Sequence, residues 1–137
     1  MEIKIADKIS ITNPEKVANI LQKILKAEGR IDQDKEHFWV VGLNPRNVIK
    51  YLELVSLGTL DTNLVHPREV FRLAIVKAVA QIIIAHNHPS GNSQPSPEDV
   101  AITKQLVKAG KILGIEVIDH IIIAGKEFAS FKDKRLM

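Results

Sequence analysis

Residues 85–99 read Ala-His-Asn-His-Pro-Ser-Gly-Asn-Ser-Gln-Pro-Ser-Pro-Glu-Asp and lie between an apolar run and a helix start. The apolar run, Ile82-Ile83-Ile84-Ala85, is typical of a buried strand. Alternate side chains of an extended chain point to the same side, so His86 and His88 can face one pocket. Ser96-Pro97-Glu98-Asp99 has the cap, proline and acids of a helix start, which brings a carboxylate to the same place. We therefore expect the fold to be organised around this junction.

Two imidazoles and one carboxylate form a ligand set that Zn²⁺ accepts, so His86, His88 and Asp99 are the predicted metal ligands. Three protein ligands leave a fourth tetrahedral position open, as in catalytic rather than structural zinc sites. The chain has no Cys, which excludes disulfides and thiolate zinc sites. Asp99 also fits a simple capping role, and the two roles can coexist.

The other elements follow from periodicity and from turn and cap residues. Helices are predicted to begin at Pro14, at Pro67 and near Ser96, the last ending at Ile112 or Leu113 before Gly114. Strands are predicted over 36–43, 48–56, 81–85, 115–124 and 127–131, with Arg30 to Lys35 as a polar linker. Within the second strand, alternation places Ile49, Tyr51, Glu53 and Val55 on one face. The predicted class is α/β (α+β), a mixed sheet flanked by helices.

Composition sets wider limits on the chain. Its 137 residues, 45% hydrophobic, suit one compact unit, with an N-terminal strand and helix extension at 1–34 and the main domain at 35–137. No stretch approaches the ~18 apolar residues of a membrane span, and the N-terminus carries acids, so we expect a cytoplasmic protein. Exposed strand edges could pair two copies into a homo-oligomer.

The motif His86-x-His88-Pro89 followed by Ser96-x-x-Asp99 resembles the JAMM motif of the JAB/MPN metalloproteases. The surrounding residues look like the RadC branch: His66-Pro67-Arg68-Glu69-Val70 precedes the motif, His-Asn-His-Pro-Ser-Gly forms it, and Asp119-His120 follows. The resemblance runs from about Asn13 onward. It implies the cytidine-deaminase-like architecture of JAB/MPN domains and Zn²⁺ bound by His86, His88 and Asp99.

The resemblance also implies a glutamate that activates a water at the metal. The upstream candidates are Glu36, Glu53 and Glu69, and we favour Glu36 because it opens an apolar strand as the JAMM glutamate does. Glu69 falls in a first helical turn, where the helix dipole already favours an acid. The family residue that matches Ser96 hydrogen-bonds the developing oxyanion, although a cap role alone would explain a serine there.

Three further histidines have simpler interpretations. His120, in an apolar strand beside Asp119, is either a structural residue or a hydrogen-bond partner of a ligand, and we favour the structural role. His66 precedes a helix, where capping or packing explains it, and His37 is predicted to be exposed.

The leading hypothesis is a zinc metallohydrolase of the metalloprotease or isopeptidase type, with a peptide or isopeptide substrate. The alternatives are a metal-dependent nuclease and a non-catalytic binding module associated with DNA repair. The net charge of +3 is compatible with nucleic acid, but the basic residues are scattered and aromatics are only 4%, which disfavours single-strand binding by stacking.

Overall fold

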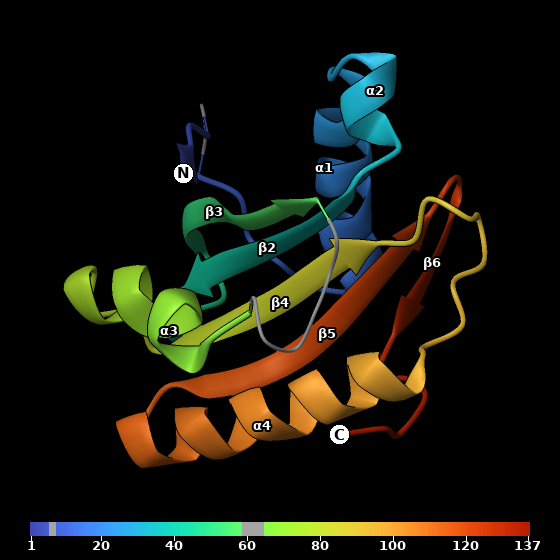
Figure 1. The fold of residues 1–137 in the computed structure, drawn as a ribbon. Coiled ribbons are helices and arrows are strands. Elements are labelled where there is room, and N and C mark those ends of the chain that lie inside the picture. The colour runs from blue at the N-terminus through green and yellow to red at the C-terminus, as the bar shows by residue number, and fades with distance from the viewer. Residues whose placement is uncertain (6–7, 59–64) are drawn as a thin grey trace.

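A computed structural model describes residues 1–5, 8–58 and 65–137 (Figure 1). In chain order its elements are β1 (Glu2–Ile3), α1 (Pro14–Lys26), α2 (Arg30–Gln33), β2 (Glu36–Leu43), β3 (Ile49–Gly58), α3 (Pro67–Val76), β4 (Gln81–Asn87), α4 (Pro97–Leu113), β5 (Glu116–Ala124) and β6 (Glu127–Ser130). The strands form one six-stranded sheet in the order β1-β3-β2-β4-β5-β6. Only the β4–β5 pair is parallel among the described strand pairs, because α4 carries the chain back between them. The predicted α+β class with a mixed sheet is confirmed.

Helices cover both faces of the sheet, with α1 on one side and α3 and α4 on the other (Figure 1). The strands β2 and β4 are buried on both faces, so their alternate residues enter two separate cores. The face toward α3 and α4 receives Phe38, Val40, Ile82 and Ile84, and the face toward α1 receives Trp39, Val41, Ile83 and Ala85. By this alternation His86 falls on the α4 side of the sheet and Asn87 on the α1 side.

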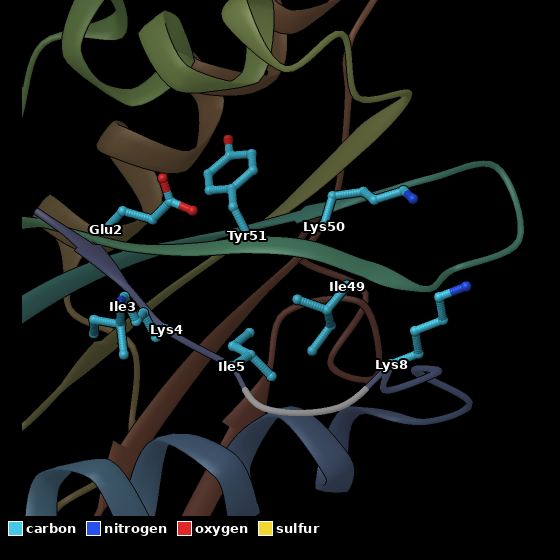
Figure 2. Close-up of a pocket in the computed structure, with 8 residues that line it drawn as sticks. All are labelled: Glu2, Ile3, Lys4, Ile5, Lys8, Ile49, Lys50 and Tyr51. Carbon is cyan, nitrogen blue, oxygen red and sulfur yellow. The ribbon is translucent and has the colours of Figure 1, made fainter.

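The hairpin of β2 and β3 departs from the predicted alternation. Gly42 pairs with Tyr51 but Leu43 pairs with Ile49, so β3 carries an extra residue, Lys50, at this point. The extra residue turns Ile49 toward α1, whereas Tyr51 packs on the α3 side. Figure 2, which shows the hollow between β1 and β3, makes the opposite directions of these two side chains plain. The prediction that Ile49 shares a face with Tyr51 and Glu53 was therefore wrong.

Two other predictions need correction. The segment predicted as a polar linker contains the short helix α2, Arg30–Gln33. His37 was predicted to be exposed but is fully buried, because the chain between α1 and β2 folds over it. Its Nδ1 lies 2.8 Å from the Lys35 carbonyl oxygen, its Nε2 lies 2.6 Å from Glu28 Oε2, and its ring stacks on Trp39.

Among the described residues, no helix is long and apolar enough to cross a membrane. The N-terminal helix α1 packs against the sheet and shares a hydrophobic core with it. Val17, Ala18 and Leu21 of α1 lie in one core with Trp39 and Ile121.

Candidate metal centre

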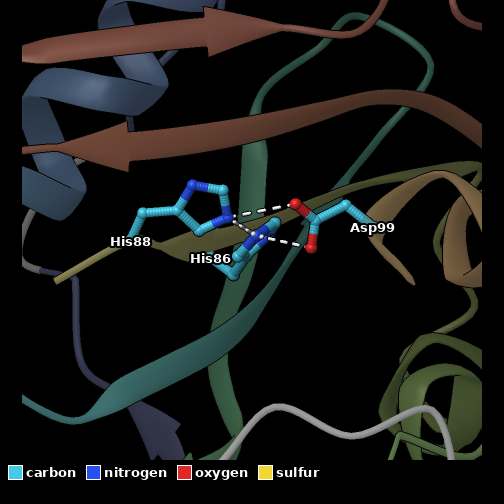
Figure 3. A group of neighbouring side chains, drawn as sticks. All are labelled: His86, His88 and Asp99. Atoms are coloured by element: carbon cyan, nitrogen blue, oxygen red, sulfur yellow. Dashed lines mark hydrogen bonds and ion pairs between the residues drawn. The ribbon is translucent and has the colours of Figure 1, made fainter. Parts of the chain in front are cut away.

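His86 is the penultimate residue of β4 and is completely buried. Its Nδ1 lies 2.7 Å from Nε2 of His120 on the neighbouring strand β5. Its Nε2 points the other way, 2.9 Å from Nε2 of His88 and 3.1 Å from Oδ1 of Asp99. The ring therefore has one nitrogen turned into the core and one turned toward the predicted metal ligands (Figure 3).

His88 follows the end of β4 and is still tied to the sheet. Its backbone N–H donates to the carbonyl oxygen of Ile123 in β5 at 2.7 Å. The loop then turns back, with Gly91 at φ 86°, so that Nδ1 of His88 lies 2.7 Å from the carbonyl oxygen of Asn92. A carbonyl oxygen only accepts, so Nδ1 carries a proton, and in the neutral ring the lone pair of Nε2 faces Asp99.

Asp99 combines a cap with a place among the ligands. It is the third residue of α4, and its Oδ2 accepts the N–H of Ser96 at 2.8 Å while its own N–H donates to Oγ of Ser96 at 3.1 Å. The same Oδ2 lies 3.0 Å from Nε2 of His88. The capping box thus fixes the carboxylate in the position where it meets both imidazoles.

The electrostatics of the group reflect this convergence. Burial by itself would raise the pKa of Asp99, but the hydrogen bonds with His86 and His88 and the Ser96 amide outweigh it and hold the pKa well below its usual range. The pKa of His88 is raised, chiefly by its hydrogen bond with Asp99. The carboxylate is therefore ionised at neutral pH.

These three side chains could hold a metal ion, since their ligand atoms all lie within 4.8 Å of one another. The donor set fits zinc, because two imidazole nitrogens and a carboxylate oxygen are the atoms that zinc binds in proteins. In neutral His88, the lone pair of Nε2 and the carboxylate of Asp99 point toward the same position. Lone pairs meeting at this spacing repel one another unless a cation lies between them. At neutral pH that cation is either a proton or a metal.

A cavity of about 350 Å³ opens beside this group. Its lining includes His88 and Asp99 together with Glu36, the first residue of β2, and Ser96, the N-cap of α4. Both residues that the resemblance assigned to catalysis thus lie on the wall of the cavity that two of the predicted metal ligands also line. The charge of Glu36 contributes to the raised pKa of His88, which places it in the electrostatic reach of the ligands.

The segment that carries Glu36 is held to the predicted metal ligands by Asn87, the residue between the two histidines. Oδ1 of Asn87 accepts the N–H of His37 at 2.6 Å, and its Nδ2 donates to the carbonyl oxygen of Lys35 at 3.0 Å. The side chain of Asn87 therefore binds the backbone on both sides of Glu36. The sequence did not indicate this role of Asn87, since the partner lies 50 residues upstream.

The other two glutamate candidates lie elsewhere. Glu53 is buried in the middle of β3, where its Oε2 lies 3.3 Å from Nη2 of Arg72 on α3, and Glu69 lies 3.9 Å from the same guanidinium. Neither lines the cavity beside the histidines. Burial raises the pKa of Glu53, although the N-terminal amine and Arg72 lower it.

Two buried residues complete the surroundings of His86. His120 contacts it directly, which favours the hydrogen-bond role that the sequence had left as the alternative. Thr103 was not predicted at all; its Oγ1 lies 2.6 Å from Nδ1 of His120. Its position one helical turn after Asp99 was the available signal. His66 is the N-cap residue of α3 and makes no side-chain cap hydrogen bond within the described part of the chain.

Comparison with known proteins identifies the family of the chain. The family model for the RadC-like JAB domain matches residues 11–136. The chain belongs to the RadC-like JAB domain family. Curated relatives include UPF0758 proteins from Caldanaerobacter subterraneus subsp. tengcongensis, 48% identical, Desulforamulus reducens, 44% identical, and Bacillus cereus strain B4264, 45% identical.

The matches to these three relatives cover 93%, 95% and 98% of this chain but 53%, 55% and 57% of the relatives, respectively. The chain thus spans about half the length of the curated relatives that it matches. The RadC-like JAB domain is consistent with the mixed sheet and four helices described above.

Proposed function

We propose that this RadC-like JAB domain is a zinc-dependent hydrolase that cleaves an amide bond of a peptide or isopeptide substrate. The proposal rests on one observation above all. The two imidazoles and the carboxylate converge at the edge of an open cavity whose wall also carries Glu36 and Ser96. A metal-ligand set, a second carboxylate and a hydroxyl around one cavity are the parts that hydrolysis of a carbonyl compound needs.

A zinc ion held by His86, His88 and Asp99 would lower the pKa of a bound water toward ~7 and polarise a substrate carbonyl. The chain's own residues supply the rest. We assign Glu36 as the general base that accepts a proton from the attacking water and returns it to the leaving amine. It lines the same cavity as His88 and Asp99, which the substrate would enter.

Ser96 can serve as cap and as oxyanion donor at once. Its Oγ accepts the N–H of Asp99, which uses a lone pair and leaves its own O–H proton to donate. Because Ser96 lines the cavity, we assign that proton to the oxygen that becomes negative during attack. The cap holds the hydroxyl in place before the substrate arrives.

The test compares Glu36→Gln with Glu53→Gln in zinc-loaded protein. Both substitutions remove one carboxylate and keep the side-chain shape, but only the first touches the cavity. Cleavage of internally quenched peptides and Nε-acyl-lysine isopeptides is measured, and zinc content is determined in parallel. We expect Glu36→Gln to retain zinc and to lose ~10²-fold or more in rate, with Glu53→Gln close to the unmodified chain.

Several results would count against the proposal. An unchanged rate for Glu36→Gln would exclude it as the base, and loss of activity in Glu53→Gln alone would transfer the role to Glu53. Chelator-sensitive cleavage of DNA, with the peptides and isopeptides left intact, would favour a metal-dependent nuclease instead.

A further inference from the structure

A string of buried hydrogen bonds runs from the start of α4 to the metal-ligating histidine His86. Oγ1 of Thr103 lies 2.7 Å from the backbone carbonyl oxygen of Asp99 and 2.6 Å from Nδ1 of His120. Nε2 of His120 lies 2.7 Å from Nδ1 of His86. Thr103 and His120 are each about 1% exposed, so water does not compete for these bonds.

The direction of each bond follows from the groups themselves. The carbonyl of Asp99 has no proton, so the proton between it and Thr103 belongs to the hydroxyl. The hydroxyl has no second proton, so the proton between Thr103 and His120 must come from Nδ1 of His120. The structure thus leaves only one direction for the first two bonds.

The third bond depends on how many protons His120 carries. The ring of His120 stacks on Phe131 with centroids 4.4 Å apart and meets Phe38 edge-on, in a place where an isolated charge is costly. In the neutral ring the single proton is already on Nδ1, so Nε2 accepts. His86 therefore donates from Nδ1, and its Nε2 is left with a lone pair pointing at His88 and Asp99.

We propose that Thr103 and His120 are positioning residues that set the tautomer of His86 in which Nε2 can bind the metal. Neither residue contacts the metal position. His88 achieves the same tautomer with the carbonyl oxygen of Asn92, so each ligand histidine has its own acceptor at Nδ1. This series of hydrogen bonds begins at the backbone carbonyl of Asp99, so it also connects Asp99 to His86. The inference rests on the zinc site of the proposed function.

The test measures zinc affinity by competition with a chelator. Thr103→Val keeps the shape of the side chain but removes the acceptor for His120, which allows the proton to move to Nε2 and oppose His86. We expect Thr103→Val and His120→Leu to weaken zinc binding about 10–100-fold. Thr103→Ser keeps the hydroxyl and should bind zinc as the unmodified chain does. His120→Gln offers an amide oxygen to His86 and should recover part of the loss.

A control separates positioning from general destabilisation. Leu106→Ala, in the same helix as Thr103, leaves a cavity in the hydrophobic core and should lower the free energy of unfolding without changing zinc affinity. The ring ¹⁵N signals of His120 give a second readout, which needs no zinc. The proton is expected on Nδ1 in both the metal-free and the zinc-loaded protein.

The possible results are distinct. Zinc binding by Thr103→Val as tight as in the unmodified chain, or a proton on Nε2 of His120, would overturn this inference and leave the zinc site standing. An unmodified chain that binds no zinc would overturn the proposed function and this inference together.

Discussion

At the scale of residues, Asp99 shows why the site is compact. One carboxylate accepts the N–H of Ser96 and also meets two imidazoles, so the start of α4 and the end of β4 are joined through a single side chain. These contacts agree with the expectation that Asp99 can cap the helix and also lie among the predicted metal ligands. The sequence was enough to predict this grouping, because Asp99 follows His88 by only 11 positions and His86 by only 13.

His37 shows the opposite case. The sequence predicted an exposed residue, but Glu28 and Lys35 surround it and bring it into the core. Nothing in its immediate neighbours indicated this burial, because the contact depends on how the segment after α1 folds back. The roles of Asn87 and Thr103 escaped sequence reasoning for the same reason, since their partners lie on other elements.

The metal-free protein should have a pH-dependent stability that comes from the same residues. His88 has a raised pKa because of Asp99, so its contribution is fully present below the unfolded pKa of ~6.5 and is lost as pH rises through the folded value. Asp99 has a lowered pKa, so its contribution is present above ~3.9 and is lost as pH falls through its folded value. We expect the contribution of this pair to be largest between these limits.

Thermal unfolding of the metal-free protein from pH 5 to pH 9 measures this dependence, with His88→Ala as the control that should flatten it above pH 6. Zinc affinity should change in the opposite direction and increase with pH, because the metal replaces the protons. Identical unfolding profiles for the two proteins across the range would contradict the assignment.

At the scale of elements, the strands and helices with clear boundaries were predicted closely. The sequence predicted strand 36–43, and β2 covers Glu36–Leu43; it predicted a helix ending before Gly114, and α4 ends at Leu113 with Gly114 at φ 74°. The apolar residues Val70, Phe71, Ala74, Ile75 and Ala78 have helical spacing and predict a helix from Pro67 that reaches Ala78. The helix ends sooner: Ile75 is 55% exposed, and Ala78 lies beyond its end at Val76.

The extra residue in β3 was beyond sequence reasoning. Alternation is a local pattern, whereas the pairing of Gly42 with Tyr51 and of Leu43 with Ile49 is decided between two strands. This pairing requires a residue without a side chain at position 42 of β2. The ring of Tyr51 lies directly over Gly42, so that a Cβ at this position would overlap it.

We therefore expect Gly42→Ala to lower the free energy of unfolding by about 1–3 kcal/mol, because the buried Tyr51 ring must move. Urea unfolding measures the change. Gly29→Ala is the matched control: apart from its chain neighbours, no atom of the described residues lies within 4 Å of the added Cβ, and the effect should stay within about 0.5 kcal/mol. Equal stabilities of the two variants would show that the close contact is not required.

At the scale of the whole molecule, the sheet brings together groups from distant parts of the chain. β4, the loop after it and α4 supply the three predicted ligands, β5 supplies His120, and β2 supplies Glu36 from about 50 residues upstream. The predicted ligand set could be read from one short stretch, since all three residues fall within 86–99. The glutamate could not be chosen by spacing, and only the resemblance favoured Glu36 over Glu53.

The central claim is that His86, His88 and Asp99 bind zinc, and the zinc content of the purified protein beside His88→Ala tests it most directly. We predict about one zinc ion per chain in the unmodified protein, removable by a chelator and restored by added zinc. His88→Ala should retain little of it after the same treatment, with Glu53→Gln as the control that keeps its zinc. Equal zinc in the unmodified protein and His88→Ala, or none in either, would contradict the claim.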